Sequence, residues 1–119
     1  MLIGMIISMH AELLLHERNA LDSDSFVELK VWRAPTQVPG SSHSFKYAPA
    51  YIVRNHCVLR YDNEAGKGDH KHTGADEVAY PFTTPEQLLT DFWADVHSRR
   101  ANDHDSDDES HGNPLGGVP

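Results

Sequence analysis

The sequence has little of several features that would place it in a large class of proteins. Cys57 is the single cysteine among 119 residues, which excludes an internal disulfide and suits a reducing compartment such as the cytoplasm. The apolar run at 1–8 is too short to span a bilayer, and it lacks a basic flank and a small-residue cleavage site. We therefore expect an apolar N-terminal extension at 1–8, a cytoplasmic protein and no membrane partner. The Cys57 side chain is expected to be buried.

Internal repeats and a nucleotide-binding phosphate loop are also missing. The run Gly66-Lys67-Gly68 resembles such a loop only superficially, because the Walker A pattern needs Ser or Thr directly after its Gly-Lys pair. A chain of this length is expected to fold as one domain, which we place at 9–100.

Basic residues are scarce, since 10 Lys and Arg stand against 18 Asp and Glu, a formal charge of −8. Five of these acidic residues crowd into 102–110 without a basic residue among them. Such a segment cannot bury enough apolar surface to fold, so 101–119 is predicted to be an acidic disordered tail. Without that tail, 13 acidic residues face 10 basic ones, and 54–72 carries four basic residues against three acidic ones. An acidic protein with such a stretch can still bind RNA locally.

Apolar and polar residues alternate along several short segments, as is typical of half-buried strands. In one of them Val27, Leu29 and Val31 fall on the same face, and the polar stretch 19–25 before it predicts a hairpin. Pro49 lacks the N–H that a strand ladder needs, so its strand is expected to lie at an edge or to carry a bulge. The predicted strands are 11–18, 26–33, 45–54, 57–62 and 77–82.

A helix is predicted at 85–100, with Thr84 as its N-cap, Pro85 in its first position and Gln87 three residues after the cap. Its apolar residues repeat at helical spacing, which predicts one face packed on the sheet. Those residues are Leu88, Leu89, Phe92, Trp93 and Val96. The predicted fold is α+β, an antiparallel sheet of four to five strands packed against one C-terminal helix.

The chemistry-bearing residues gather between the end of one predicted strand and a His-x-His pair. If the second segment is extended, His70 and His72 share a face, with Asp69 and Lys71 on the other. Two imidazoles on one face suit acid and base work near neutral pH. Lys67, between two glycines, has the freedom to reach a phosphate. A surface His-x-His pair without function remains the alternative.

Several neighbouring residues are predicted to assist these histidines. Asp62 or Asp69 would orient an imidazole ring, as carboxylates do in catalytic triads. Tyr61 would stack on a base and Lys71 would stabilise negative charge. The Tyr-Asp-Asn run has a plainer reading as a turn at a strand end. The predicted substrate-binding residues are Tyr61, Asn63, Arg60, Lys71 and Lys46.

Taken together, these segments resemble the TumE family of toxin–antitoxin toxins over about 9–96. The main resemblance is the run Val-Leu-Arg-Tyr-Asp-Asn-Glu-Ala-Gly-Lys-Gly-Asp-His-Lys-His at 58–72. Shorter similar segments are Val-Trp-Arg-Ala-Pro at 31–35, Ser-Phe-Lys-Tyr at 44–47, Tyr-Pro-Phe at 80–82 and Leu-Leu-Thr-Asp-Phe at 88–92. The resemblance implies a small growth inhibitor of a type II module, partnered by a helix-turn-helix antitoxin.

Three hypotheses follow for the activity. The first is metal-independent, cofactor-free RNA cleavage, in which His70 and His72 share acid and base duty while Lys67 and Lys71 stabilise charge. The second is a metal-dependent enzyme that uses His70, His72, Asp62 and Asp69 as a ligand set. The third is a non-enzymatic protein that inhibits growth by binding a partner. A homodimer is left open.

Overall fold

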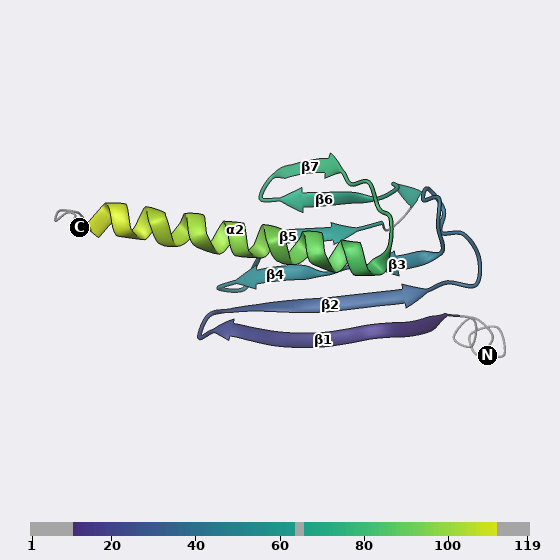
Figure 1. Cartoon of the computed structure of the whole chain (residues 1–119), viewed down its shortest axis with the longest axis horizontal. Helices are drawn as coiled ribbons and strands as arrows, with labels where there is room; N and C mark the ends of the chain where they lie inside the picture. Colours follow the sequence, from purple (N-terminus) through teal and green to yellow (C-terminus); the bar gives the residue numbers. More distant parts are fainter. Residues whose placement is uncertain (1–10, 64–65, 112–119) are drawn as a thin grey trace.

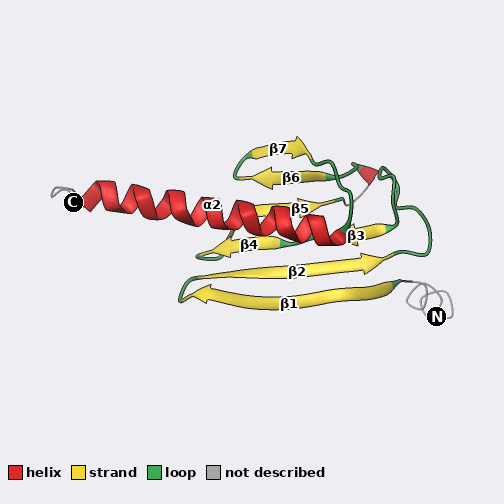
Figure 2. Cartoon of the chain, viewed as in Figure 1, coloured by secondary structure: helices red, strands yellow, loops and turns green. Residues whose placement is uncertain are grey.

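The computed structural model describes residues 11–63 and 66–111. The strands are β1 (Glu12–Asp22), β2 (Ser25–Arg33), β3 (Phe45–Tyr47), β4 (Ala50–Val53), β5 (His56–Asp62), β6 (His70–Thr73) and β7 (Asp76–Ala79) (Figure 2). They form one antiparallel sheet in the order β1-β2-β4-β5-β6-β7, with β3 also paired to β2. A long helix, α2 (Pro85–His111), crosses one face of this sheet (Figure 1). The α+β class is confirmed, and the seven strands exceed the predicted four to five.

The predicted hairpin at the start of the domain is present as β1 and β2. Its turn is shorter than expected, because β1 continues to Asp22 and β2 begins at Ser25. Val27, Leu29 and Val31 are buried on one face of β2, as their alternation predicts. The other face of β2 therefore presents Trp32 and the polar residues that alternate with the buried ones.

Two irregularities interrupt the central strands. Ala48 and Pro49 separate β3 from β4, and both short strands pair with β2. The predicted strand at 45–54 is therefore divided at Ala48 and Pro49, and it does not lie at an edge, because β4 is paired on both sides, with β2 and with β5. In β5 the register shifts between the pairs Tyr51–Leu59 and Ile52–Cys57, so one extra residue forms a bulge. Cys57 is exposed, and the prediction that it is buried is wrong because the bulge breaks the alternation on which it rested.

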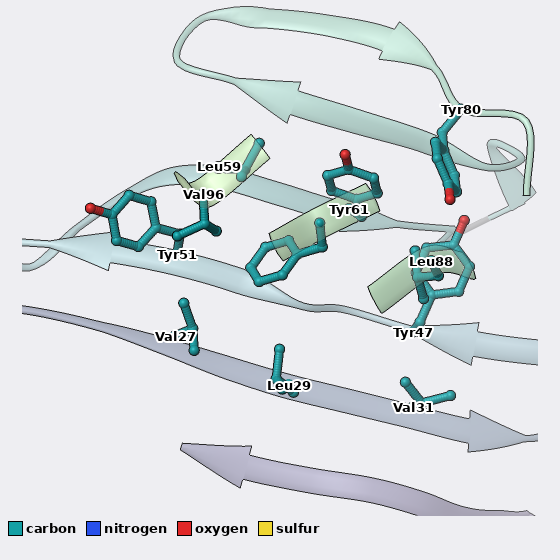
Figure 3. Close-up of a cluster of buried hydrophobic side chains, with 11 residues drawn as sticks. Val27, Leu29, Val31, Tyr47, Tyr51, Leu59, Tyr61, Tyr80, Leu88 and Val96 are labelled. Carbon is teal, nitrogen blue, oxygen red and sulfur yellow. The ribbon is translucent and has the colours of Figure 1, made fainter. Parts of the chain in front are cut away.

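The hydrophobic core lies between the sheet and the first half of α2 (Figure 3). Thr84 Oγ1 accepts a hydrogen bond from the Gln87 backbone N–H over 3.1 Å, which confirms the predicted N-cap. The buried stripe of the helix is Leu88, Phe92 and Val96, each with no exposed surface. Trp93 is only partly buried at the margin of this core. The core strand residues are Val27, Leu29, Val31, Tyr47, Tyr51, Leu59 and Tyr61.

The helix is longer than the sequence predicts. It continues to His111, whereas the predicted end is Arg100, and it extends beyond the end of the sheet (Figure 1). Residues 101–111 of the predicted disordered tail belong to this helix, and the disorder of the rest stays a prediction, because 112–119 lie outside the described residues, as does the predicted extension at 1–8. Among the residues that are described, no helix combines the length and apolarity needed to cross a membrane.

Candidate functional site

Strand register brings the predicted histidines and the predicted aspartate together. Asp62 of β5 lies directly opposite His70 of β6, and Arg60 lies opposite His72. On the other side of β6, His72 lies opposite Glu77 of β7. Directly paired residues in antiparallel strands project to the same face. Because Leu59 and Tyr61 face α2, these five side chains lie on the face that α2 leaves open, and we call them the β5–β7 cluster.

The centre of the β5–β7 cluster is a buried contact between Asp62 and His70. His70 Nε2 lies 2.7 Å from Asp62 Oδ1, and the two residues are only 5% and 6% exposed. Glu77 Oε2 approaches the same Nε2 to 3.4 Å, while Arg60 Nε lies 2.8 Å from Asp62 Oδ2. The prediction that Asp62 contacts a histidine is therefore consistent with the structure.

The backbone before β6 fixes the ring of His70. Its Nδ1 lies 2.9 Å from the carbonyl oxygen of Gly68, and a carbonyl can only accept a hydrogen bond. Nδ1 must therefore carry a proton, and Nε2 is the nitrogen that faces the two carboxylates. Gly68 adopts a φ of +83°, which favours glycine at the position that supplies this carbonyl.

His72 lies beside His70 with a different environment. The two rings meet edge to face, with centroids 4.7 Å apart. Nδ1 of His72 is 3.9 Å from Glu77 Oε1, and its Nε2 is buried without a hydrogen-bond partner. The prediction that His70 and His72 share a face is confirmed, and their environments show that they are not equivalent.

Unpaired polar atoms are concentrated in this cluster. In the described part of the chain, the buried side-chain atoms without a hydrogen-bond partner are Arg60 Nε, Asp62 Oδ1 and His72 Nε2. The contacts of Asp62 with Arg60 and with His70 given above are thus close polar contacts that lack hydrogen-bond geometry. Burying an unpaired polar atom costs about 1–3 kcal/mol. Such a cost calls for an explanation, and a reactive site or a ligand supplies one.

Asp69 lies outside this cluster. Its Oδ1 accepts hydrogen bonds from Tyr47 Oη at 2.6 Å and from His43 Nε2 at 2.9 Å. His43 accepts the Phe45 backbone N–H at Nδ1, so its proton is on Nε2. The prediction that Asp69 lies on the opposite face from His70 and His72 is confirmed. The predicted metal-ligand set is therefore wrong about Asp69. Glu77, and not Asp69, lies beside the two histidines.

Lys71 and Tyr61 also face the helix side of the sheet. Lys71 Nζ lies 3.0 Å from Asp95 Oδ2 of α2, and the Tyr61 hydroxyl donates to the same carboxylate. Tyr61 is 1% exposed and sits among the core side chains (Figure 3). Burial and the neighbouring Asp95 carboxylate raise the pKa of Tyr61 well above its ordinary range. Its ring is thus not placed to stack on a base, and Lys71 is not placed to stabilise charge at the histidines.

Asn63 has a structural position at the end of β5. It is 1% exposed, its amide donates to the carbonyl oxygen of Phe45 over 2.7 Å, and its Oδ1 accepts the Tyr47 backbone N–H. These bonds tie β3 to β5, so Asn63 is unsuited to contact a substrate. The plainer reading of the Tyr-Asp-Asn run, a structured strand end, applies to Asn63.

The remaining predicted residues lie nearer the surface. Lys67 is exposed in the loop that leads to Gly68. Lys46 of β3 lies opposite Trp32 of β2, and the alternation of β2 puts both on the open face together with Arg60. Trp32 is half-buried there and remains available as an aromatic platform.

Sequence reasoning missed Glu77. The sequence did contain a pattern that could have indicated it, since Gly74 lies between two short segments that can form a hairpin. In the structure Gly74 adopts a φ of +61° in that turn. Pairing across this turn puts Glu77 opposite His72. The resulting cluster can transfer protons, stabilise an anion through Arg60, or hold a cation. Asp62, His70 and His72 each offer a ligand atom, and these atoms lie within 4.8 Å of one another.

Comparison with known proteins gives a single family. The family model described as "Toxin TumE" matches residues 10–100, which include the whole β5–β7 cluster and the buried half of α2. No curated protein and no solved structure matches the chain significantly. The match covers most of the chain and agrees with the resemblance that the sequence carries around the cluster. The chain therefore belongs to the TumE toxin family.

Proposed function

We propose that this toxin inhibits growth by cleaving RNA at the β5–β7 cluster. The observation that carries the proposal is the coincidence of two independent features. In the described part of the chain, buried polar atoms lack a hydrogen-bond partner at Arg60, Asp62 and His72. His72 belongs to the histidine pair that the sequence singles out, and the other two residues lie beside that pair. A polar cluster kept at this cost on an open sheet face fits a reactive site better than a structural one.

The arrangement supports unequal roles for the two histidines. Both ring nitrogens of His70 are engaged, Nδ1 by the Gly68 carbonyl and Nε2 by Asp62. His70 is therefore a positioning residue, although the sequence predicts that it shares acid and base duty. His72 retains an unpaired Nε2, and its side chain is 25% exposed. His72 is the better candidate for proton transfer in this site.

Glu77 is the second proton-transfer group in this proposal. Its carboxylate lies 3.9 Å from His72 Nδ1 and its side chain is 43% exposed. Attack of a ribose 2′-hydroxyl on the adjacent phosphorus needs a base for the hydroxyl proton and an acid for the leaving oxygen. One of these groups would serve as base and the other as acid. Arg60, which is 43% exposed, would stabilise the negative charge on the phosphorane.

The open face beside the cluster supplies features suited to single-stranded RNA. Trp32 and Lys46 lie on this face on adjacent strands, and aromatic rings with nearby cations are a common platform for unstacked bases. Trp32 thus takes the stacking role that the sequence assigned to the buried Tyr61. The helix-turn-helix antitoxin is the proposed partner, and the cytoplasm the proposed location.

Expression of the chain with and without the adjacent gene tests the proposal. Induction alone is expected to stop growth and to fragment cellular RNA, and co-expression of the neighbour is expected to restore both. His72→Ala should abolish both effects, whereas the matched control His56→Ala, at the exposed first residue of β5, should keep them. Arrested growth with intact RNA would agree with a toxin but would contradict RNA cleavage as its activity.

A further inference from the structure

We infer that the β5–β7 cluster is also a binding site for a divalent transition-metal ion, with zinc as the best-suited ion. The proposed ligands are Asp62, His70, His72 and Glu77. Imidazole nitrogens and carboxylate oxygens form the ligand sets that proteins use for such ions. The site consists of two nitrogen and two oxygen donors on three adjacent strands.

The orientation of His70 is that of a metal ligand. Histidines that bind a metal almost always donate their other ring N–H to a carbonyl or carboxylate, which fixes the tautomer. Here Nδ1 donates to the Gly68 carbonyl, so the Nε2 of a neutral ring presents its lone pair to the cluster. The same Nε2 lies 2.7 Å from Asp62 Oδ1 and 3.4 Å from Glu77 Oε2. A metal ion between this nitrogen and the two carboxylate oxygens would contact all three donor atoms.

Two of the proposed ligands carry buried polar atoms that lack a hydrogen-bond partner. Asp62 Oδ1 and His72 Nε2 are buried without a hydrogen-bond partner. Asp62 is only 5% exposed, so its Oδ1 atom is directed into the cluster and not into solvent. A coordinated ion would satisfy it.

The distances between the donor atoms are close to those of a zinc site. Metal–ligand bonds of roughly 2.0–2.2 Å put two donors of a tetrahedral zinc ion about 3.4 Å apart. The donor atoms of Asp62, His70 and His72 lie within 4.8 Å of one another, and Glu77 Oε2 is 3.4 Å from His70 Nε2. Small side-chain rotations would therefore bring the donors to coordination distance without moving the strands.

A consequence for activity rests on the proposed function. An ion held by His72 and Glu77 occupies the lone pairs that the proposed RNA cleavage needs for proton transfer. Bound zinc is therefore expected to inhibit cleavage, so that metal supply controls the toxin. Neither Asp69 nor Lys71 takes part, because both face the opposite side of the sheet.

Metal binding is tested first without RNA. The full-length protein, stripped with a chelator and dialysed, is titrated with zinc against a chromophoric chelator and separately with cobalt(II). We expect one ion per chain and a tetrahedral cobalt spectrum. Glu77→Gln, on an exposed strand, should weaken binding by roughly tenfold or more, and Asp62→Asn should remove the cobalt spectrum. His56→Ala is the matched control and should bind like the wild type.

The outcomes separate this inference from the proposed function. Absence of binding, or binding that Glu77→Gln and His72→Ala leave unchanged, would overturn the metal site. RNA cleavage by the stripped protein, lost on adding zinc, would support the inhibitory role. If RNA cleavage requires zinc, both the inhibitory role of zinc and the metal-independent mechanism would be wrong. The proposed metal-binding site would still stand. If Asp62→Asn does not fold, Glu77→Gln still decides the result.

Discussion

Nδ1 of His70 donates a hydrogen bond to the carbonyl oxygen of Gly68 across 2.9 Å. This bond links the glycine-containing loop that carries Lys67 to the buried pair of His70 and Asp62. The loop therefore fixes which ring nitrogen of His70 faces the cluster. It does so through the backbone of Gly68 and not through a side chain. The geometry of the cluster depends on backbone position as much as on side-chain identity.

Substitutions at the two histidines should separate positioning from proton transfer. His72→Ala is expected to lower cleavage by about 10²–10⁴-fold with little loss of stability, because the side chain is partly exposed. His70→Ala should lower activity and also destabilise the fold by about 1–3 kcal/mol, since it leaves the buried carboxylate of Asp62 without its nearest polar contact. Toxicity assays and denaturant unfolding of both variants measure the difference.

A conservative variant checks the positioning role. His70→Gln keeps a polar side chain beside Asp62 and should restore part of the stability and activity that His70→Ala loses. His72→Gln cannot transfer protons and should remain inactive. Equal activity of the two glutamine variants would contradict the assignment of unequal roles.

Gly40 should be essential to the shape of the site although it lies far from it in sequence. A Cβ at Gly40 would meet the Gly66 carbonyl oxygen at 2.4 Å and the Gly68 nitrogen at 2.8 Å, and its φ is +87°. Gly40→Ala should displace the loop that bonds His70, with reduced toxicity and a lower melting temperature. Gly74→Ala is the matched control, because its φ is +61° but no atom lies within 4 Å. It should cost only the local strain, about 1 kcal/mol.

High pH should destabilise the protein through its buried tyrosines. Burial and hydrogen bonds to carboxylates raise the pKa of Tyr47, Tyr61 and Tyr80 above the ordinary value. A group whose folded pKa is raised holds its proton more tightly in the folded state. Its stabilising effect is complete below about pH 10 and is lost as pH rises further. Melting temperatures measured from neutral to strongly alkaline pH should fall above that point.

Tyr61→Phe provides the comparison for this effect. It removes one hydroxyl that must ionise on unfolding, so its melting temperature should fall less steeply with rising pH. Parallel curves for the variant and the wild type would show that Tyr61 does not contribute to the alkaline loss.

Removal of 101–119 should leave the domain folded and toxic. Among the described side chains of that segment, Asp103 makes one ion pair, with Arg99 at 3.9 Å, and its side chain is 63% exposed. Exposed pairs contribute about 0–1 kcal/mol, so the melting temperature of the truncated chain should fall by roughly 4 °C or less.

Arg100→Ala in the full chain is the contrasting variant. The Arg100 guanidinium donates to Ser25, Tyr51 and Asp22 and so joins α2 to the first hairpin and to β4. This variant should lower the melting temperature more than the truncation does. The reverse order would mean that the helix beyond Arg100 contributes to stability.

The sequence by itself determined the features that depend on neighbours in the chain. The alternation in β2, the cap at Thr84 and the shared face of His70 and His72 follow from local periodicity and hydrogen-bonding groups. The break at Pro49 has the same local origin. These were predictable because strand and helix periods are set by backbone geometry within a few residues.

Only the tertiary structure decided which residues join the histidines. Register across two hairpins selected Glu77 over Asp69, although Asp69 adjoins His70 in sequence. Because α2 packs on one face of the sheet, Tyr61 lies in the core and Lys71 lies at the margin of the core. A bulge in β5 exposed Cys57. Register, bulges and the covered face arise from contacts between distant segments, and a one-residue shift would reverse every assignment to a face.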